Sequence, residues 1–495
     1  MRINLLGGTY IQKYPSVNTE RTINWYPVPK TQNSNDRTPV SLFPYPGLTK
    51  FVSLPGNYNR GIASVRTNTV DYCFTVVDTT AYQIFPNGSY KVIGSMPAMG
   101  IGQTSPVFII GNKSNQVGFF NYNAGYIYTI APAGSPGTFT QITNNSLSTY
   151  PNYVEGMDYM DGQTFLVSNG GVGWCNVNDM TTWPGINFLS PTTSASAAKA
   201  VATLKNQIWI FTDQTVEIYY NNAGTFTRQP YTTALVGLVA KYSIAKFDQG
   251  IFFLGRASTG ETGVYLAMSN YTCMMKSDFG VSWALNNTTG SLTDAYGFIQ
   301  YSKDGHIFYH LTLPSLGRTF VYDVMTQFWS ERQSISPVNS SDGTTITAGF
   351  RAKYITQFQQ NTLATDIYSP HIYVIDPTNV TENGTTIIRT RISQTYDQEL
   401  KNMSIYNLQI DTNTGQTQSS GITPQLMIEA SKNSGLWYST YRTAQLGFDS
   451  DGDRTYRALV TQLGTQRLWT LKITLSDPVD LVLIGAIANG TMASY

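Results

Sequence analysis

Residues 201–220, VATLKNQIWIFTDQTVEIYY, constrain the fold of this chain more than any other stretch. β-Branched and aromatic residues fill two runs, 208–211 and 216–220, and polar turns precede each run. A period of two with this composition is typical of β-strands. The stretch therefore predicts a meander of three strands joined by two tight turns.

Similar meanders recur through the central three hundred residues. Each opens on an apolar residue, and successive opening residues lie 45, 50, 44, 43, 54 and 52 positions apart: Ile62, Val107, Met157, Val201, Ile244, Phe298 and Phe350. The four-stranded blades of β-propellers repeat every ~40–50 residues, and packing them in a ring covers the faces that a single blade leaves exposed. We therefore expect an all-β protein with a β-propeller of six or seven four-stranded blades over residues 61–386.

The two ends of the chain differ from the repeats. Residues 1–60 contain Pro44 and Pro46, which oppose a central strand, so we expect an irregular N-terminal arm that closes the propeller, with a short edge strand at residues 50–54. Residues 387–495 contain longer alternating runs between loops rich in Gly, Ser, Asp and Asn, and they predict a C-terminal antiparallel β-sandwich. No run predicts a helix of more than two turns.

Composition restricts the classes of function. Charged residues make up 12% of the chain, aromatic residues 13% with 33 Tyr, and the formal net charge is +1. Such a surface suits permanent assemblies and argues against binding nucleic acid by phosphate neutralisation. The three cysteines are too scattered for a disulfide framework or a zinc site and fit buried apolar thiols: Cys73, Cys175 and Cys273. We expect a chain made in a cytoplasm, without a signal peptide or membrane binding of its own.

Two patterns could hold a metal ion. His306 and His310 share one face of a predicted strand, but neither they nor the third histidine, His371, has further ligands nearby in sequence, so we expect ordinary strand histidines. Residues 449–453, DSDGD, are similar to the start of a calcium loop. Arg454 stands where that loop needs Gly and Val460 where it needs Glu, which favours a hairpin turn. We expect no bound metal and no cofactor.

Enzymatic activity has weak support in the sequence. A propeller glycosidase places two carboxylates across its central channel, and four acidic residues are candidates by their repeat positions: Asp158, Glu217, Asp248 and Asp323. Each is also expected at a turn or strand edge, and the catalytic sequence motifs of common enzyme classes are missing. Four tryptophans could stack on sugars or pack between blades: Trp174, Trp183, Trp283 and Trp437. We expect no catalytic residues.

The order of several motifs resembles the tail hub family of short-tailed bacteriophages, also called packaged-DNA stabilisation or tail nozzle proteins. The motifs are residues 43–49 (FPYPGLT), 216–220 (VEIYY), 263–266 (GVYL), 321–323 (VYD) with Trp329, 429–431 (EAS) with 434–435 (SG) and 437–438 (WY), and Arg454, Gly464 and Arg467. Residues 43–49 carry two residues more than the family motif, and the EAS hairpin lacks the family's Asp. The resemblance spans nearly the whole chain and is one of pattern, with few identities.

The resemblance implies a structural role in the virion tail. In that family a hexameric ring attaches below the portal and adaptor proteins, extends the DNA channel, helps to retain packaged DNA, and anchors a tail needle or distal tip and tailspikes or fibres. Genomic DNA would pass through the lumen without sequence-specific binding. Two other interpretations stay open: a glycan-binding phage adhesin or propeller glycosidase, and a propeller scaffold in a cellular complex.

Overall fold

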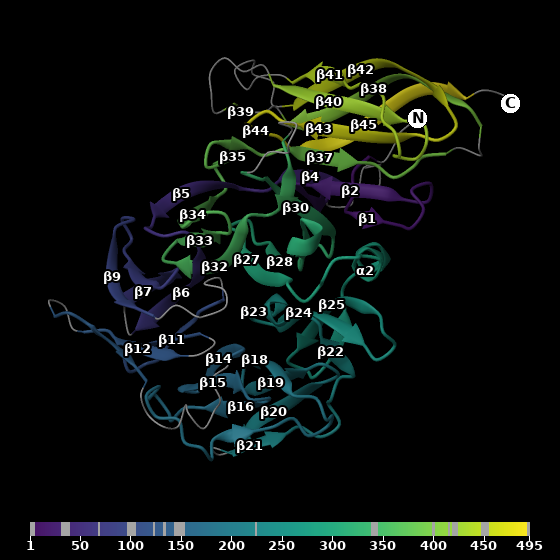
Figure 1. Cartoon of the computed structure of the whole chain (residues 1–495). Coiled ribbons are helices and arrows are strands. Elements are labelled where there is room, and N and C mark those ends of the chain that lie inside the picture. Colours follow the sequence, from purple (N-terminus) through teal and green to yellow (C-terminus); the bar gives the residue numbers. More distant parts are fainter. Residues whose placement is uncertain are drawn as a thin grey trace.

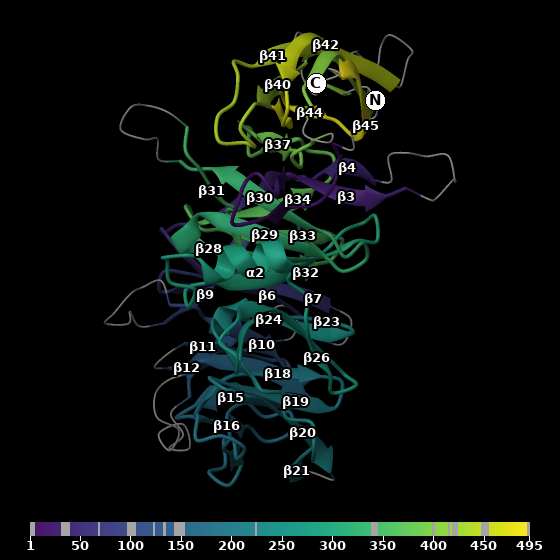
Figure 2. The same ribbon diagram turned by 90° about the vertical axis from the view of Figure 1, so that its right-hand side faces the viewer.

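A computed structural model gives the three-dimensional structure of the chain. It describes residues 5–30, 40–67, 70–96, 105–121, 124–131, 135–142, 154–222, 225–337, 345–397, 401–413, 416–417, 424–446 and 455–492. Figure 1 shows a ring of β-sheets seen along its axis, with a second β-domain above it, and Figure 2 shows the same two parts from the side.

The ring contains seven β-sheets among the described residues, and the first four are regular antiparallel blades. Blade 1 consists of β6 (Asn59–Thr67), β7 (Val70–Val77), β8 (Thr80–Ile84) and β9 (Tyr90–Ser95). Blade 2 consists of β10 (Phe108–Gly111), β11 (Gln116–Phe120), β12 (Gly125–Thr129) and β13 (Thr138–Gln141). Blade 3 consists of β14 (Gly156–Met160), β15 (Gln163–Ser168), β16 (Gly171–Trp174) and β17 (Phe188–Leu189). Blade 4 consists of β18 (Ala198–Leu204), β19 (Gln207–Thr212), β20 (Val216–Asn222) and β21 (Thr225–Arg228).

The last three blades carry additions. Blade 5 consists of β22 (Val236–Leu238), β23 (Ala245–Phe247), β24 (Gly250–Ala257), β25 (Thr262–Met268) and β26 (Cys273–Met275), with the 3-10 helix η1 (Lys241–Ser243) between β22 and β23. Blade 6 consists of β27 (Tyr296–Tyr301), β28 (Ile307–Leu313), β29 (Arg318–Asp323) and β30 (Trp329–Ile335), with η2 (Pro314–Leu316) and β31 (Thr347–Gly349). Blade 7 consists of β32 (Ala352–Phe358), β33 (Asn361–Asp366), β34 (His371–Asp376) and β5 (Gly47–Ser53), with β35 (Thr381–Glu382) and β36 (Thr385–Thr386).

The predicted propeller is confirmed, and seven is the correct blade number of the two expected. Four of the predicted opening residues lie inside innermost strands, while Val107, Ile244 and Phe350 lie one or two residues before such a strand. The predicted meander at residues 201–220 forms β18, β19 and β20, and Lys205 has a φ of 55° in the first turn. The repeat was readable because every blade uses the same strand, turn, strand unit.

Alternate residues of each inner strand pack against different neighbouring blades. In β19, Ile208 and Ile210 pack against blade 3 around Phe165, whereas Trp209 and Phe211 pack against blade 5 around Phe253. Successive side chains in a strand point to opposite faces of the sheet, so a blade buried on both faces is apolar throughout. The result is a continuous apolar layer from blade to blade around the ring.

The first 60 residues are not an irregular arm: they contain β1 (Tyr10–Ile11), β2 (Thr19–Ile23), β3 (Trp25–Pro29), β4 (Val40–Pro44) and β5. β5 is the outer strand of blade 7, where Leu48 pairs with Ile375 of β34. The other four strands belong to sheets of the second domain. Pro27 and Pro29 are tolerated because β3 is an edge strand, and Pro44 is tolerated because it is the last residue of β4.

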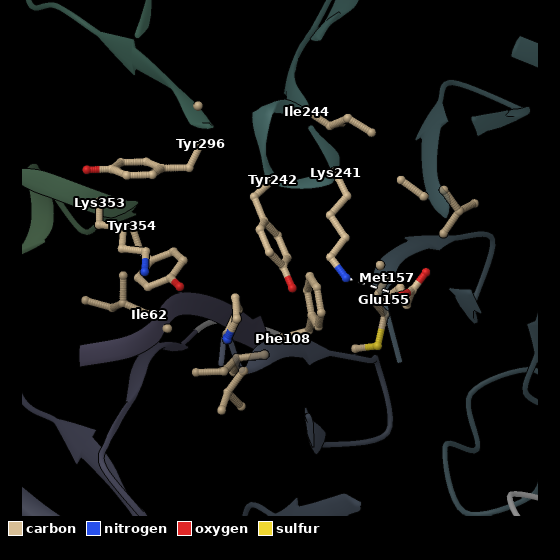
Figure 3. Close-up of a pocket in the computed structure, with 18 residues that line it drawn as sticks. Ile62, Phe108, Glu155, Met157, Lys241, Tyr242, Ile244, Tyr296, Lys353 and Tyr354 are labelled. Atoms are coloured by element: carbon tan, nitrogen blue, oxygen red, sulfur yellow. Dashed lines mark hydrogen bonds and ion pairs between the residues drawn. The ribbon is translucent and has the colours of Figure 1, made fainter. Parts of the chain in front are cut away.

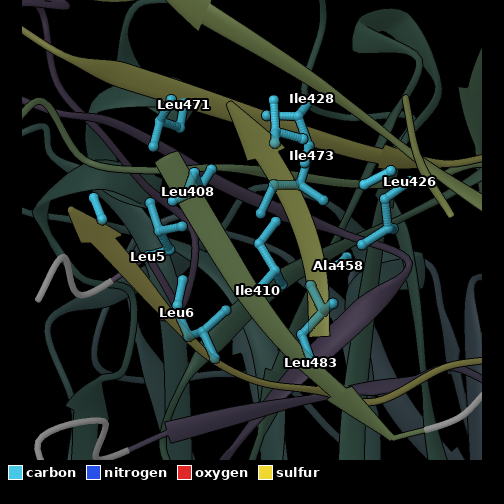
Figure 4. Close-up of a cluster of buried hydrophobic side chains, with 14 of the residues drawn as sticks. Leu5, Leu6, Leu408, Ile410, Leu426, Ile428, Ala458, Leu471, Ile473 and Leu483 are labelled. Carbon is cyan, nitrogen blue, oxygen red and sulfur yellow. The ribbon is translucent and has the colours of Figure 1, made fainter. Parts of the chain in front are cut away.

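The second domain is a β-sandwich. One sheet contains β2, β37 (Arg389–Ile392), β43 (Thr470–Leu475), β40 (Gln425–Ser431) and β41 (Arg442–Gln445), with β1 beside β2. The other contains β3, β4, β45 (Leu483–Met492), β38 (Met403–Asn413) and β42 (Thr455–Gln466). A short pair, β39 (Gln416–Thr417) and β44 (Val479–Asp480), lies beside them. Leucine and isoleucine side chains from both sheets and from residues 5–6 fill the space between the sheets (Figure 4).

The propeller and the sandwich share one continuous sheet. β30 of blade 6 pairs in parallel with β2 at Glu331 and Ile23, and β2 pairs with β37 of the sandwich. The buried Glu331 accepts hydrogen bonds from Arg21 Nε at 2.9 Å and Arg318 Nε at 3.0 Å. Backbone and charge contacts therefore hold the two domains together at this junction.

One helix departs from the sequence expectation. α2 (Phe279–Asn286) has eight residues, slightly more than two turns, and precedes blade 6. The carboxylate of Asp278 caps its first turn by accepting a hydrogen bond from the backbone N–H of Val281 at 2.8 Å. In the described part of the chain, no helix is long and apolar enough to span a membrane.

Candidate functional site

The innermost strands surround a cavity of about 290 Å³ on the ring axis, which we call the axial cavity (Figure 3). All seven blades contribute to its wall, with residues from β6, β10, β14, β18, η1, β27 and β32. A second cavity of about 380 Å³ adjoins it and shares Ile62, Ile244, Lys353 and Tyr354 as lining residues. The two cavities together follow the centre of the propeller.

A break in the innermost strand of blade 5 provides one side of the axial cavity. β22 and β23 both pair with β24, and η1 between them carries Lys241 and Tyr242 to the cavity wall. Ser243 holds this turn: its hydroxyl donates to the carbonyl oxygen of Ala240 at 2.6 Å and accepts from the N–H of Leu254 at 2.9 Å. Two consecutive polar side chains thereby reach the cavity from one blade.

Lys241 is paired with an acid. Its ammonium group lies 3.3 Å from Glu155 Oε1 and 5.2 Å from the ring centre of Tyr242. Burial lowers the pKa of Lys241, but Tyr242 and Glu155 together outweigh burial, so the pKa is raised above its ordinary value. Lys241 therefore remains charged and neutralised on this side of the cavity.

Lys353 and Tyr354 provide the opposite side, as Figure 3 shows. The ammonium group of Lys353 lies 5.7 Å from the ring centre of Tyr296 and 5.2 Å from that of Tyr354. Within the described ranges no carboxylate pairs with Lys353, and burial lowers the pKa of its ammonium group. The cavity thus holds one cation whose neighbours are aromatic faces.

A second lysine and acid pair lies beside the adjoining cavity. Lys246 of β23 lines that cavity, and its ammonium group lies 2.7 Å from Asp158 Oδ2. Asp158 also accepts hydrogen bonds from the N–H and hydroxyl of Thr203 at 2.6 and 3.0 Å. This predicted carboxylate is therefore already bound to a cation and a neighbouring strand.

The structure does not bring the four predicted carboxylates together in the described region. They lie in four different blades and at three different strand positions: Asp158 in β14, Glu217 in β20, Asp248 between β23 and β24, and Asp323 at the end of β29. The buried Glu217 carboxylate accepts from the backbone N–H of Thr193 at 2.8 Å and from the Tyr219 hydroxyl at 2.9 Å. These bonds tie Glu217 to its own strand and to the loop before β18.

His306 and His310 both contact the ring of Phe308, but the surroundings of the three histidines differ. His306 Nδ1 lies 2.7 Å from Asp323 Oδ2, and this hydrogen bond raises the pKa of His306. His310 is fully buried against Phe298, and burial lowers its pKa well below the ordinary value. His371 begins β34 in blade 7. Across the described ranges, no three His, Cys, Asp or Glu residues form a cluster that could hold a metal.

The remaining candidates divide between core and surface. Trp174 and Trp183 are buried in blade 3, Trp283 lies in α2, and Trp437 is 78% exposed. Residues 449–454, with the calcium-like segment, lie outside the described residues.

The predicted thiols are mostly buried, as the sequence indicated. Cys73 and Cys175 are buried and Cys273 is half-buried. Burial raises the pKa of both Cys73 and Cys273 to about 12, so neither thiol ionises readily near neutral pH.

Sequence reasoning missed the residues that line the axial cavity. Glu155, Lys241, Tyr242, Lys353 and Tyr354 each stand two to four residues from a predicted opening residue. That proximity was the available signal, because opening residues mark the strands nearest the axis. The sequence did not reveal which side chains point inward.

A closed ring of seven blades with a central cavity and an attached sandwich places the chain in the class of β-propeller proteins. The family model Phage_stabilise, described as Bacteriophage P22 Gp10, beta-propeller, matches residues 1–410. The chain belongs to this family, and it is a bacteriophage structural protein. No curated protein matches the chain.

The chain is also similar to solved structures, at TM-scores below 0.5 for the three that follow. A chain in the structure of S. cerevisiae dbp5 bound to nup159 and gle1 has 9% identity and a TM-score of 0.41, over 72% of this chain and 98% of that chain. BamB from Moraxella catarrhalis has 9% identity and a TM-score of 0.34, over 65% and 92%. An exo-beta-1,3-galactanase from Phanerochaete chrysosporium has 11% identity and a TM-score of 0.29, over 90% and 99%.

Proposed function

We propose that this protein is the hub, or nozzle, of a short phage tail. Six copies form a ring that attaches below the portal and adaptor proteins after the genome is packaged. The ring extends the DNA channel, helps to retain the DNA, and anchors a needle or distal tip and tailspikes or fibres. The family match over residues 1–410 is the observation that carries this proposal.

The surface chemistry supports a role in permanent contacts. Large apolar side chains are exposed on the outer part of the ring, at Ile186 and Tyr231, and in the loop after β40 of the sandwich, at Leu436 and Trp437. Such side chains are enriched at protein interfaces. A ring of identical subunits needs two different complementary surfaces on each copy, and the elongated two-domain chain offers separate regions for them.

The charge balance supports passage of DNA rather than its retention by binding. The formal net charge is +1, and many lysines and arginines are already paired with acids in the structure. Affinity for DNA comes largely from lysine and arginine contacts with phosphates. A channel of this composition lets DNA slide, and retention then depends on the needle or tip that the hub carries.

The experiment that tests this proposal uses phage particles that lack the protein. We expect heads that package DNA and then lose it, seen by electron microscopy as empty heads without a distal tail, and rescued by the wild-type chain supplied in trans. Full heads that keep their DNA and carry complete tails would overturn the proposal. Binding of the purified chain to host polysaccharide, with normal particles in its absence, would favour an adhesin instead.

A second experiment concerns assembly in the host cytoplasm before incorporation into the virion tail. We propose that the free chain is monomeric and forms its ring only on the adaptor. Sedimentation of the purified chain with and without adaptor rings measures this directly. A hexamer without any partner would contradict the switch but not the hub role.

A further inference from the structure

We propose that the axial cavity is a binding site for a small organic oxyanion, whose carboxylate or phosphate group is held by Lys353 and Tyr354. The apolar part of the ligand packs against the opposite wall. The site lies within one chain, so the inference is independent of the hub function and of the number of copies in the ring.

The first argument is charge. Two of the three lysines that line the cavities are neutralised, Lys241 by Glu155 at 3.3 Å and Lys246 by Asp158 at 2.7 Å. Lys353 is half-buried, and in the described part of the chain it has no such acid. A partly desolvated cation without a counter-charge is unfavourable, and a bound anion would supply the missing charge.

The second argument is an unpartnered hydroxyl group beside that lysine. The hydroxyl oxygen of Tyr354 is buried and has no hydrogen-bond partner in the described structure. Figure 3 shows that it lies on the same side of the cavity as Lys353. A tyrosine hydroxyl donates one hydrogen bond, which a carboxylate or phosphate oxygen accepts.

The third argument is backbone geometry. Consecutive side chains of a regular strand point to opposite faces, so those of Lys353 and Tyr354 would diverge in a strand without a distortion. The pairing of β32 with β33 shifts register between Ala352 and Ile355, which is a β-bulge at these two residues. Bulges of this kind re-aim side chains and are frequent beside binding sites. The bulge faces the strand break at η1 across the same cavity.

The fourth argument is the shape and lining of the cavity. Its volume of about 290 Å³ approaches the lower end of the range for small-molecule sites, roughly 300–1,000 Å³. Phe108, Met157 and Val201 provide apolar wall opposite the bulge. A few polar groups in a mostly apolar cavity fix the orientation of a ligand that has one charged end.

The test uses three probes that share one ring and differ in charge: benzoate, phenyl phosphate and benzyl alcohol. Calorimetric titration and thermal unfolding of the full chain measure their binding. We expect one or both anions to bind and to raise the unfolding temperature with concentration, and benzyl alcohol to do neither. The comparison of benzoate with phenyl phosphate distinguishes a carboxylate site from a phosphate site.

Substitutions locate the binding. Lys353→Met should weaken anion binding about tenfold or more, as expected for loss of a charged hydrogen bond, and Tyr354→Phe should weaken it by a smaller factor. Lys91→Met is the matched control, because Lys91 is exposed in the outer strand β9 and the change in net charge is the same. Tyr354→Phe keeps the ring in place and serves if Lys353→Met does not fold.

Two results would overturn the proposal. One is the failure of both anions to bind the wild-type chain at millimolar concentration. The other is binding that Lys353→Met and Tyr354→Phe leave unchanged, since the anion would then occupy another part of the surface. Loss of binding in Lys91→Met to the same extent as in Lys353→Met would be a further case of the second result, because binding would again not depend on the cavity.

Discussion

Glu331 carries an ion cluster that joins the propeller to the sandwich. Its buried carboxylate in β30 accepts hydrogen bonds from Arg21 of β2 at 2.9 and 2.7 Å, and from Arg318 of β29 at 3.0 Å. Glu331→Gln removes the negative charge while keeping the shape of the side chain. We therefore expect a large loss of stability and a changed response to acid.

The magnitude follows from the pKa of the carboxyl group. Burial alone would raise the pKa of Glu331, but Arg21 and Arg318 outweigh burial and lower it from 4.5 to about 2. A carboxyl with a depressed pKa contributes stability above its unfolded pKa and loses it as the pH falls from 4.5 toward 2. The full contribution is ~3 kcal/mol, and about 2 kcal/mol of it is lost by pH 3.

The assay compares free energies of unfolding from urea denaturation at pH 6 and pH 3. Glu331→Gln should be less stable than the wild type by about 3–5 kcal/mol at pH 6, because two guanidinium groups lose their shared acid. At pH 3 this difference should shrink by ~2 kcal/mol. Other titrating groups cancel, since both proteins contain them.

Glu261→Gln is the control, because Glu261 is exposed between β24 and β25 and should change stability little at either pH. A difference between wild type and Glu331→Gln that stays the same at both pH values would refute the reasoning. It would mean that the guanidinium groups do not lower the pKa of this carboxyl in the folded protein.

Three further predictions concern the interior. His310→Phe should change the free energy of unfolding at pH 8 by no more than ~1 kcal/mol. At pH 5.5 the variant should have gained about 1.4 kcal/mol relative to the wild type, because the buried imidazole resists protonation while the imidazole of the unfolded chain takes up a proton below pH 6.5. Urea denaturation at both pH values measures this difference. Leu48→Ala should cost about 2–5 kcal/mol in the same assay, because it leaves a cavity under the outer strand of blade 7, and an unchanged midpoint would contradict that account. Gly61→Ala should destabilise by ~1–3 kcal/mol, since the new Cβ would lie 2.3 Å from the carbonyl oxygen of Val107, whereas Gly185→Ala meets nothing within 4 Å and should be near neutral on thermal unfolding.

The propeller could be predicted because its strands follow a local rule. Ile208 and Trp209 face different neighbouring blades, so the strand is apolar on both faces, and the turn before it repeats in every unit. The strands of the sandwich were equally readable: among the alternating runs expected in residues 387–495, the one at residues 403–410 lies within β38 and the one at residues 425–430 lies within β40. Period and turn chemistry are properties of short segments, and the sequence displays them directly.

The role of the first 60 residues could not be predicted in the same way. Leu48 pairs with Ile375, and Leu42 pairs with Leu483, so the partners lie more than 300 residues away in sequence. The residues around a strand do not indicate which distant strand it will pair with. Prolines near these strands also argued against them, and their tolerance depends on strand edges and ends that only the assembled sheets define.

The axial cavity was hidden for a related reason. Lys353 and Tyr354 reach the cavity from a bulge in β32, and Lys241 and Tyr242 reach it from η1, which breaks a strand. An inserted residue or a short turn changes which way side chains point without changing residue type. The sequence therefore located the strands near the axis but not the side chains inside it.

Because β5 closes the ring, blade 7 cannot be completed until synthesis reaches its partner strand, β34. The strand that completes blade 7 leaves the ribosome about 320 residues before β34, its partner, and at roughly 5–20 residues per second it waits tens of seconds. β4 waits still longer for β45. During that interval the N-terminal strands have unpaired backbone N–H and C=O groups. Pairing with another nascent copy of the chain is therefore the misfolding risk that this topology brings.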